Sequence, residues 1–311
     1  MGKLDGRIAI ITGAGGGIGA AVSKALGREG ARIVANDIGA SLDGEGRDTG
    51  AADAVVAAIN DAGGEAVANY DSITDYDAAE NIIQTALDSF GGLDILINVA
   101  GNLRDRMIFN MREDEWDAVQ AVHLKGTFNT SKYASIYWRQ ERKGHYRLIN
   151  FTSISGLSGA AGQPNYAAAK LGIVGLTYSC SRALDRYGVT ANAISPGAAT
   201  RMTQSVPEDR QRIATPDEDP ERSPDNVATP VVYIASDRSD WLTGQVIGAR
   251  GYEISLYNKP EVISELTASA PWSVDDAFEA IERQFRPAIE NFKPVIDRPP
   301  FYPDPQVAPP A

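Results

Sequence analysis

Residues 7–29 read RIAIITGAGGGIGAAVSKALGRE, and this stretch decides the fold. Residues 7–11 form a short apolar run of strand length, and residues 20–29 have the composition of a helix. The turn between them contains Gly13, Gly17 and Gly19. Because glycine has no side chain, such a turn can approach a pyrophosphate, and the N-terminus of the next helix favours its negative charge. The stretch predicts a dinucleotide-binding unit, although its spacing departs from G-x-G-x-x-G and glycine-rich turns also occur without ligands.

The rest of the chain alternates predicted strands with predicted helices. Further strands are expected over residues 32–36, 66–69, 93–99, 146–151, 190–194 and 245–249. Further helices are expected over residues 51–62, 75–90, 114–137, 166–187 and 225–236. Alternating elements with short links imply a parallel sheet that helices cover on both faces. We therefore expect an α/β fold, a single doubly wound Rossmann-type domain with a parallel sheet and a C-terminal extension.

Composition limits the classes of partner. The 311 residues carry a net charge of -12, which opposes nucleic-acid binding and requires a local basic patch for any anionic substrate. Cys180 is the single cysteine, which excludes an internal disulfide framework and suits a reducing compartment. The sequence shows no signal-peptide region and no apolar run of membrane-spanning length. We expect a cytoplasmic protein with a small-molecule substrate, no metal site and no nucleic-acid or membrane partner.

Asp37 lies at the end of the second predicted strand, where the adenosine ribose of a dinucleotide would bind. A carboxylate there accepts hydrogen bonds from ribose hydroxyls and repels a 2′-phosphate. Neither the glycine loop nor the neighbours of Asp37 include an arginine or lysine. The sequence thus favours NAD over NADP, and the alternative is that Asp37 is a solvated loop residue.

Residues 149–170, INFTSISGLSGAAGQPNYAAAK, place three reactive side chains close together. Tyr166 and Lys170 are four residues apart in helix-forming sequence and share one helix face. Ser153 follows an apolar strand and reaches them if strand and helix meet. A free tyrosine titrates near ~10, and a neighbouring ammonium lowers that pKa. The trio can therefore move a proton to or from an alcohol oxygen, although the tyrosine and lysine can equally be exposed residues of an amphipathic helix.

Together these motifs resemble the short-chain dehydrogenase/reductase family over roughly residues 4–251. The matching positions are residues 12–19 (TGxxxGxG), residues 98–101, Ser153, Tyr166, Lys170, Pro196 and Gly197. The resemblance implies that Tyr166 is the catalytic acid/base, that Lys170 lowers its pKa and binds a ribose, and that Ser153 positions the substrate oxygen. The cofactor-binding residues that it implies, with Asp71 and Ser72 at the adenine, are Gly13, Gly17, Ile18, Gly19, Asp37, Asp71, Ser72, Asn98, Ala100, Gly101, Tyr166, Lys170, Pro196, Gly197 and Thr200.

Three positions depart from the family pattern. His123 occupies the place of a catalytic asparagine, so it is a candidate for proton relay or a packed helix histidine. Val99 replaces the second asparagine of the NNAG motif. Thr200 comes one residue earlier than in PGxxxT, which weakens its assignment as a cofactor ligand.

A narrower resemblance is carried by residues 36–39, 68–72, 103–106, 122–124 and 200–203. These segments are similar to the (3R)-hydroxyacyl-CoA dehydrogenase domain of multifunctional enzyme type 2 (17β-hydroxysteroid dehydrogenase type 4) and its bacterial single-domain relatives. The resemblance implies NAD-dependent oxidation of a 3-hydroxyacyl-CoA or a steroid side-chain thioester. The alternatives are a 3-oxoacyl thioester reductase, a dehydrogenase of free steroids or cyclic alcohols, and a non-catalytic dinucleotide sensor.

The expected domains are an NAD-binding domain over residues 1–252 and an extension over residues 253–311. Residues 204–224 match the position of a substrate flap in the family, and the extension carries one predicted helix, 273–285, and a proline-rich tail. Basic residues expected near the phosphates of CoA are Arg104, Arg106 and Arg201, and the alternative for each is a structural ion pair. The family resemblance also implies a homodimer or homotetramer built on the helices over residues 114–137 and 166–187.

Overall fold

The computed structural model describes residues 2–142, 144–198 and 219–290. The chain divides into two units, Met1–Tyr257 and Asn258–Ala311. Thr200, Arg201, most of the expected flap and the proline-rich tail lie outside the described residues.

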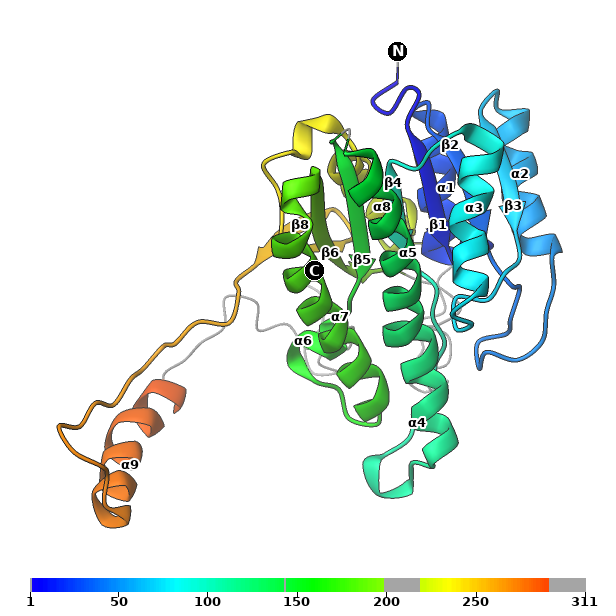
Figure 1. Ribbon diagram of the computed structural model, residues 1–311. Coiled ribbons are helices and arrows are strands. Elements are labelled where there is room, and N and C mark those ends of the chain that lie inside the picture. Colours follow the sequence, from blue (N-terminus) through cyan, green and yellow to red (C-terminus); the bar gives the residue numbers. More distant parts are fainter. Residues whose placement is uncertain (1, 143, 199–218, 291–311) are drawn as a thin grey trace, which may run out of the picture. The chain divides into compact units, whose positions relative to one another are not determined.

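The first unit contains one sheet with the strand order β3-β2-β1-β4-β5-β6-β7-β8 (Figure 1). Its strands are β1 Ile8–Thr12, β2 Arg32–Asn36, β3 Glu65–Asn69, β4 Ile95–Asn98, β5 Tyr146–Phe151, β6 Val189–Gly197, β7 Val246–Arg250 and β8 Glu253–Tyr257. Every pairing is parallel except that of β7 with β8. β2 pairs with one side of β1 and β4 with the other, so the strand order reverses at β1. In such sheets, ligands bind at this reversal, beyond the carboxyl ends of the strands. The predicted doubly wound parallel sheet is confirmed.

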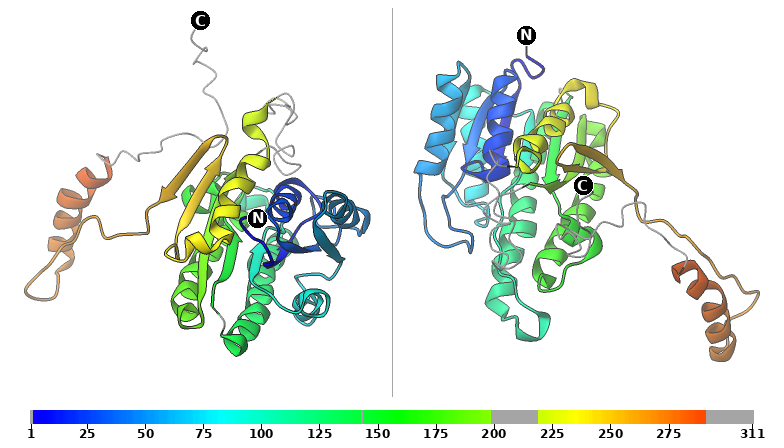
Figure 2. Two further views of the ribbon diagram at one scale, coloured as in Figure 1. Left: turned by 90° about the horizontal axis from the view of Figure 1, so that it is seen from above. Right: turned by 180° about the vertical axis from the view of Figure 1, so that it is seen from behind.

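Helices cover both faces of the sheet (Figure 2). One face packs against α1 Gly17–Arg28, α2 Gly50–Asp61 and α8 Asp225–Ala235. The other packs against α3 Ala78–Phe90, α5 Gly126–Glu141 and α7 Pro164–Ala183. The strands are buried on both sides, which explains why they read as continuous apolar runs rather than as alternating patterns.

Three local features differ from the expected elements. The helix expected over residues 114–137 is α4 Glu113–Gln120, a π-helical turn Ala121–Lys125 and then α5. A short helix, α6 Ile154–Ser158, follows β5 and is capped by Ser153. The strand β8 begins at Glu253, where no strand was predicted, and its backbone pairs with β7. Strand pairing depends on a partner distant in sequence, so the local pattern of residues 253–257 does not reveal it.

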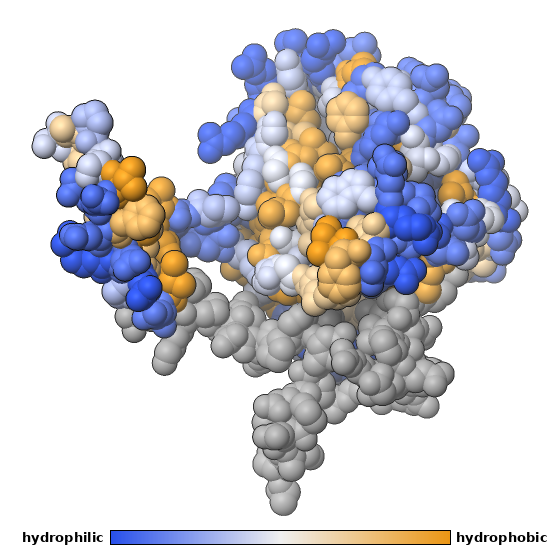
Figure 3. All heavy atoms as spheres, turned by 90° about the horizontal axis from the view of Figure 1, so that it is seen from below, coloured by the Kyte–Doolittle hydropathy of each residue, from blue (hydrophilic) through white to orange (hydrophobic). Residues whose placement is uncertain are grey.

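The second unit contains α9 Val274–Glu290, which extends beyond the helix expected over residues 273–285. Ser273 accepts a hydrogen bond from the Asp276 amide at its start, as a capping serine does. Exposed apolar side chains gather on one side of the helix (Figure 3), and they are Val274, Phe278, Ile281 and Ile289. Across the described ranges, no helix is both long and apolar enough to cross a membrane.

Candidate active site

A cleft opens at the carboxyl edge of the sheet, beside the strand-order reversal, and has a cavity volume of about 210 Å³. The predicted cofactor residues that line it are Gly13, Gly17, Ile18, Gly19, Asp37, Asp71, Ser72, Ala100, Gly101, Tyr166, Lys170 and Pro196. Asn98 and Gly197 lie behind this lining rather than in it. The loop after β2 also contributes Ile38, Ala40, Ser41, Leu42 and Gly44, which the sequence analysis did not single out. Segments from most of the chain therefore meet in one elongated site.

The glycine loop has the geometry that a pyrophosphate requires. Gly13 has a φ of +68, and a Cβ there would lie 2.7 Å from the Ala100 Cα. A Cβ on Gly19 would lie 2.0 Å from the Gly13 carbonyl oxygen. No side chain caps the start of α1 and no acidic residue lies in its first turn, so its amides face the cleft without an anionic competitor. These features fit a bound dinucleotide.

Asp37 contacts the same loop. Its Oδ2 accepts a hydrogen bond from the Gly15 amide at 2.7 Å, and its Oδ1 accepts one from the Gly39 amide at 2.7 Å. The carboxylate is thereby fixed at the end of β2, in the cleft rather than out in solvent. Its position is compatible with hydrogen bonds to ribose hydroxyls.

A row of buried polar side chains underlies the cleft across five paired strands. The register places Asn69, Asn36, Thr12, Asn98 and Asn150 side by side. Asn36 Nδ2 donates to Asn69 Oδ1 at 2.8 Å, and Asn98 Nδ2 donates to Asn150 Oδ1 at 2.9 Å. Thr12 Oγ1 accepts from the amides of Val99 and Ala100, which fixes the turn after β4. These residues become neighbours only through the register of the paired strands, so the local sequence around each one does not predict the row.

Ser153, Tyr166 and Lys170 come together where β5, α6 and α7 meet. Lys170 is buried, donates to the Phe151 carbonyl at 2.7 Å, and lies 5.6 Å from the centroid of the Tyr166 ring. Burial lowers the pKa of Lys170 to about 7. Burial also raises the pKa of Tyr166 to about 12, against the opposing effect of the Ser153 hydrogen bond. In the protein alone, burial therefore outweighs the lowering of the tyrosine pKa that the sequence led us to expect from Lys170.

His123 lies in the π-helical turn and packs edge-on against Tyr166, with ring centroids 5.0 Å apart. Its Nε2 is 2.8 Å from the Asn102 carbonyl oxygen and 3.1 Å from the Asn102 amide nitrogen. Burial, then the nearby Lys170 charge, lowers the pKa of His123 well below 6.5. Nδ1 has no partner among the described residues. A neutral imidazole held in this way suits packing and positioning better than proton transfer. Its place in a π-helical turn is typical of functional sites.

A buried asparagine, Asn165, fixes the start of α7. Its Nδ2 donates to the carbonyls of Arg104 at 2.9 Å and Glu115 at 3.0 Å, and its Oδ1 accepts from the Tyr166 amide. The loop after β4 and the start of α4 are thus attached to the helix that carries Tyr166. Asn165 was missed because nothing in its local sequence distinguishes it from a helix-capping residue.

Two of the three arginines expected near CoA, Arg104 and Arg106, have carboxylate partners. Arg104 pairs with Glu45 at 2.9 Å, and Arg106 pairs with the buried Glu115 at 3.1 Å. The pKa of Glu115 is lowered first by the hydrogen bond from the Arg112 amide and then by the charges of Arg106 and Arg112. The ionised Glu115 thus stabilises the start of α4. For Arg106 the geometry favours the structural alternative.

Comparisons with known proteins agree with this geometry. A family model described as short chain dehydrogenase matches residues 7–211. Hydroxyacyl-CoA dehydrogenase ChsB1 of Mycobacterium tuberculosis is 41% identical over 271 residues, which cover 85% of this chain and 84% of that protein. A peroxisomal hydratase-dehydrogenase-epimerase of Neurospora crassa is 48% identical over 204 residues, 66% of this chain, but the match spans only 22% of the fungal protein. The crystal structure of a short chain dehydrogenase from Mycobacterium avium has a TM-score of 0.81 and 44% identity, covering 92% of this chain and 96% of that one.

Proposed function

Because the chain belongs to the short-chain dehydrogenase family, we propose that it oxidises the secondary alcohol of a 3-hydroxyacyl-CoA to a ketone, with NAD as the acceptor. The observation that carries the proposal is the position of Tyr166 and Lys170 in the wall of the dinucleotide cleft, opposite the glycine loop. Similarity to a hydroxyacyl-CoA dehydrogenase supports the choice of substrate. A steroid side-chain thioester belongs to the same substrate class.

Each residue has a distinct role in the proposed reaction. Gly13, Gly17 and Gly19 would hold the pyrophosphate of NAD, and Asp37 would hold its adenosine ribose. The chemistry that bound NAD would supply is acceptance of the hydride from the carbinol carbon. Tyr166 takes the hydroxyl proton while Ser153 donates a hydrogen bond to the same oxygen.

Tyr166 acts as a base only as a phenolate. Since burial raises its pKa to about 12, the proposal requires protonated Lys170 and the bound ligands to lower this value during turnover. Lys170, with a pKa of about 7, changes charge near neutral pH and is suited to this control. We assign His123 to positioning Asn102 and the Tyr166 ring, since it is buried against both.

The test measures NADH formation with a 3-hydroxyacyl-CoA, its N-acetylcysteamine thioester, and a free steroid alcohol. We expect oxidation of the CoA ester, with loss of turnover but nearly unchanged NAD binding in Tyr166→Phe, because only a hydroxyl is removed. The reverse assay, with a 3-oxoacyl thioester and NADH or NADPH, separates a dehydrogenase from a reductase. Turnover of the free steroid without turnover of either thioester would contradict the proposal, as would a fully active Tyr166→Phe variant.

A further inference from the structure

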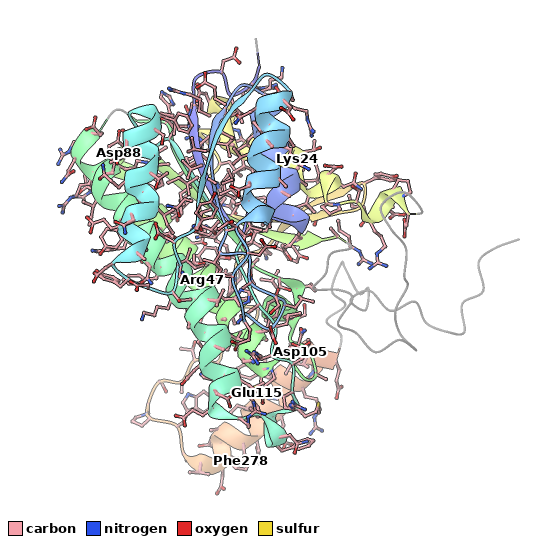
Figure 4. The ribbon with its side chains drawn as sticks, turned by 90° about the vertical axis from the view of Figure 1, so that its right-hand side faces the viewer. Lys24, Arg47, Asp88, Asp105, Glu115 and Phe278 are labelled. Atoms are coloured by element: carbon pink, nitrogen blue, oxygen red, sulfur yellow. The ribbon has the colours of Figure 1, made fainter. Side chains whose placement is uncertain are left out.

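A carboxylate without a cation partner lies in the loop that is hydrogen-bonded to the start of α7, the helix of Tyr166. Asp105 is in the loop between β4 and α4, and its Oδ2 accepts a hydrogen bond from Gln163 Nε2 at 2.8 Å. Over the described ranges, no basic side chain lies within ion-pair distance of Asp105, because Arg104 and Arg106 pair with Glu45 and Glu115 instead. Figure 4 labels Asp105, which precedes α4 in the chain, and Glu115, which lies in the first turn of α4.

Backbone hydrogen bonds on both sides fix the position of Asp105. The Arg104 carbonyl accepts from Asn165, and the Arg106 amide donates to the Gly162 carbonyl at 2.7 Å. Both partners belong to the start of α7 or the turn before it. Asp105 is consequently held at a constant position relative to Tyr166.

Side-chain hydrogen bonds connect Asp105 to the proposed substrate-binding serine. Gln163 Oε1 accepts from Ser155 Oγ at 2.9 Å, and the Ser155 amide donates to Ser153 Oγ at 3.2 Å. Asp105, Gln163 and Ser155 lie outside the lining of the dinucleotide cleft. The polar chain ends at Ser153, which the proposed reaction places at the substrate oxygen.

The charges around Tyr166 are asymmetric. Lys170 faces it from α7, neutral His123 from the π-helical turn, and Asp105 from the β4–α4 loop. After burial, the negative charge of Asp105 is the next influence that raises the pKa of Tyr166. Burial raises the pKa of Asp105 itself, while the Gln163 hydrogen bond favours its ionised form.

We propose that Asp105 is a specificity-determining residue, which admits substrates that are uncharged next to the carbinol and excludes free hydroxy acids. A second carboxylate placed two bonds from the reacting carbon would be repelled by the fixed charge of Asp105, which Arg104 and Arg106 do not neutralise because they pair with Glu45 and Glu115. A thioester carries no charge at this position, and the phosphates of CoA lie far from it along the pantetheine arm. This inference rests on the proposed function and adds a reason why the acid must be esterified before oxidation.

The experiment compares kcat/KM for 3-hydroxybutyrate with kcat/KM for its N-acetylcysteamine thioester, which lacks the nucleotide of CoA. Asp105→Asn keeps an acceptor for Gln163 and removes only the charge, so we expect the acid-to-thioester ratio to rise about tenfold. Asp105→Glu should restore most of the discrimination. Asp117→Asn, which neutralises an exposed carboxylate on α4, is the matched control and should leave the ratio unchanged.

The pH profile of kcat/KM distinguishes an effect of the Asp105 charge from a purely structural role of this residue. Removal of the Asp105 charge lowers the pKa of Tyr166, so the rise of kcat/KM with pH should begin at lower pH in Asp105→Asn, whereas a change of packing alone would not displace it. Unchanged ratio and unchanged profile in a folded Asp105→Asn protein would overturn the proposal. Failure of the unmodified protein to oxidise any thioester would contradict the proposed function instead, and the pH profile with whichever neutral alcohol it accepts would then decide on Asp105.

Discussion

Asp37 combines a charge with two backbone hydrogen bonds, and this combination predicts the cofactor preference. Because its carboxylate repels a 2′-phosphate, NAD should bind more tightly than NADP by at least ~1.4 kcal/mol, a tenfold ratio of dissociation constants. Asp37→Ala should reduce the ratio and also loosen the Gly15 and Gly39 amides. Asp37→Asn removes the charge and keeps one of the two acceptor oxygens, so it should reduce the ratio with a smaller loss of loop hydrogen bonds than Asp37→Ala. Calorimetric titration of both cofactors measures the ratio, and tighter binding of NADP to the unmodified protein would rule out this role.

Lys170 makes the free energy of unfolding depend on pH. Its pKa is about 7 in the folded protein, below the ordinary value of 10.5, so between these values the unfolded chain binds a proton that the folded chain does not. Stability therefore rises with pH over this window, by up to about 1.4 kcal/mol per pH unit from this group. Below pH 7 the full cost of burying the ammonium is present. Lys170→Met removes that cost, so its stability relative to the unmodified protein should be greatest below pH 7 and decrease toward pH 10.

Denaturation in urea at several pH values checks the Lys170 prediction. The lost hydrogen bond to the Phe151 carbonyl adds a constant offset that does not vary with pH. Parallel stability curves for the two proteins between pH 6 and 9 would show that Lys170 does not titrate in this range.

At the scale of elements, the buried amides bind the strands of the sheet beneath the cleft. Asn150 on β5 is fully buried, accepts from Asn98 on β4 and donates to Thr177 on α7 at 3.0 Å. Asn150→Ala removes both of these hydrogen bonds, at a cost of about 1–3 kcal/mol for each, although Asn98 keeps its bond to Ser131 and Thr177 its bond to Ile173. We expect a destabilisation of about 2–4 kcal/mol with weaker NAD binding, since the Asn98 strand end leads into the cleft. Asn81→Ala, an exposed position on α3, should change stability by less than about 0.5 kcal/mol.

Thermal denaturation with and without NAD measures the effect of Asn150→Ala. If the Asn150→Ala protein were as stable as the Asn81→Ala control, the hydrogen bonds of Asn150 would contribute nothing to the free energy of unfolding.

At the scale of the whole molecule, the exposed apolar residues of α5 and α7 bear on assembly. Ile173 and Val174 of α7 are buried within the chain itself. Phe128 and Leu171 are instead exposed, by 45% and 54% of their surface. We propose that these helices form the contact between copies in a homodimer or homotetramer, because the association would cover both side chains.

Light scattering at micromolar concentration tests the assembly. Leu171→Glu or Phe128→Glu should lower the measured mass, whereas Lys24→Glu, an exposed charge change on α1, should not. A monomeric mass for the unmodified protein would exclude the proposed contact.

The sequence alone predicted the alternation of strands β1 to β7 with helices, the glycine loop, and Asp37, Ser153, Tyr166 and Lys170 as site residues, whose roles stay predictions. These features depend on neighbours within a few residues, such as the four-residue spacing of Tyr166 and Lys170 or the glycines between β1 and α1. The predicted helix boundaries agree with the observed ones to within a few residues for the same reason. The exception is the π-helical turn at His123, which adds a residue to one helical turn.

Only the tertiary structure decided the remaining features. Asn36, Asn69, Asn98 and Asn150 form one row because strands distant in sequence pair in a particular register. Asp105 approaches Tyr166 because Asn165 and Gly162 hold its loop, and β8 forms because β7 offers an open edge. The pKa of Lys170 likewise depends on how completely the fold buries it. A local pattern specifies which residues can react or pair, whereas burial and long-range pairing determine which groups they meet and at what energy.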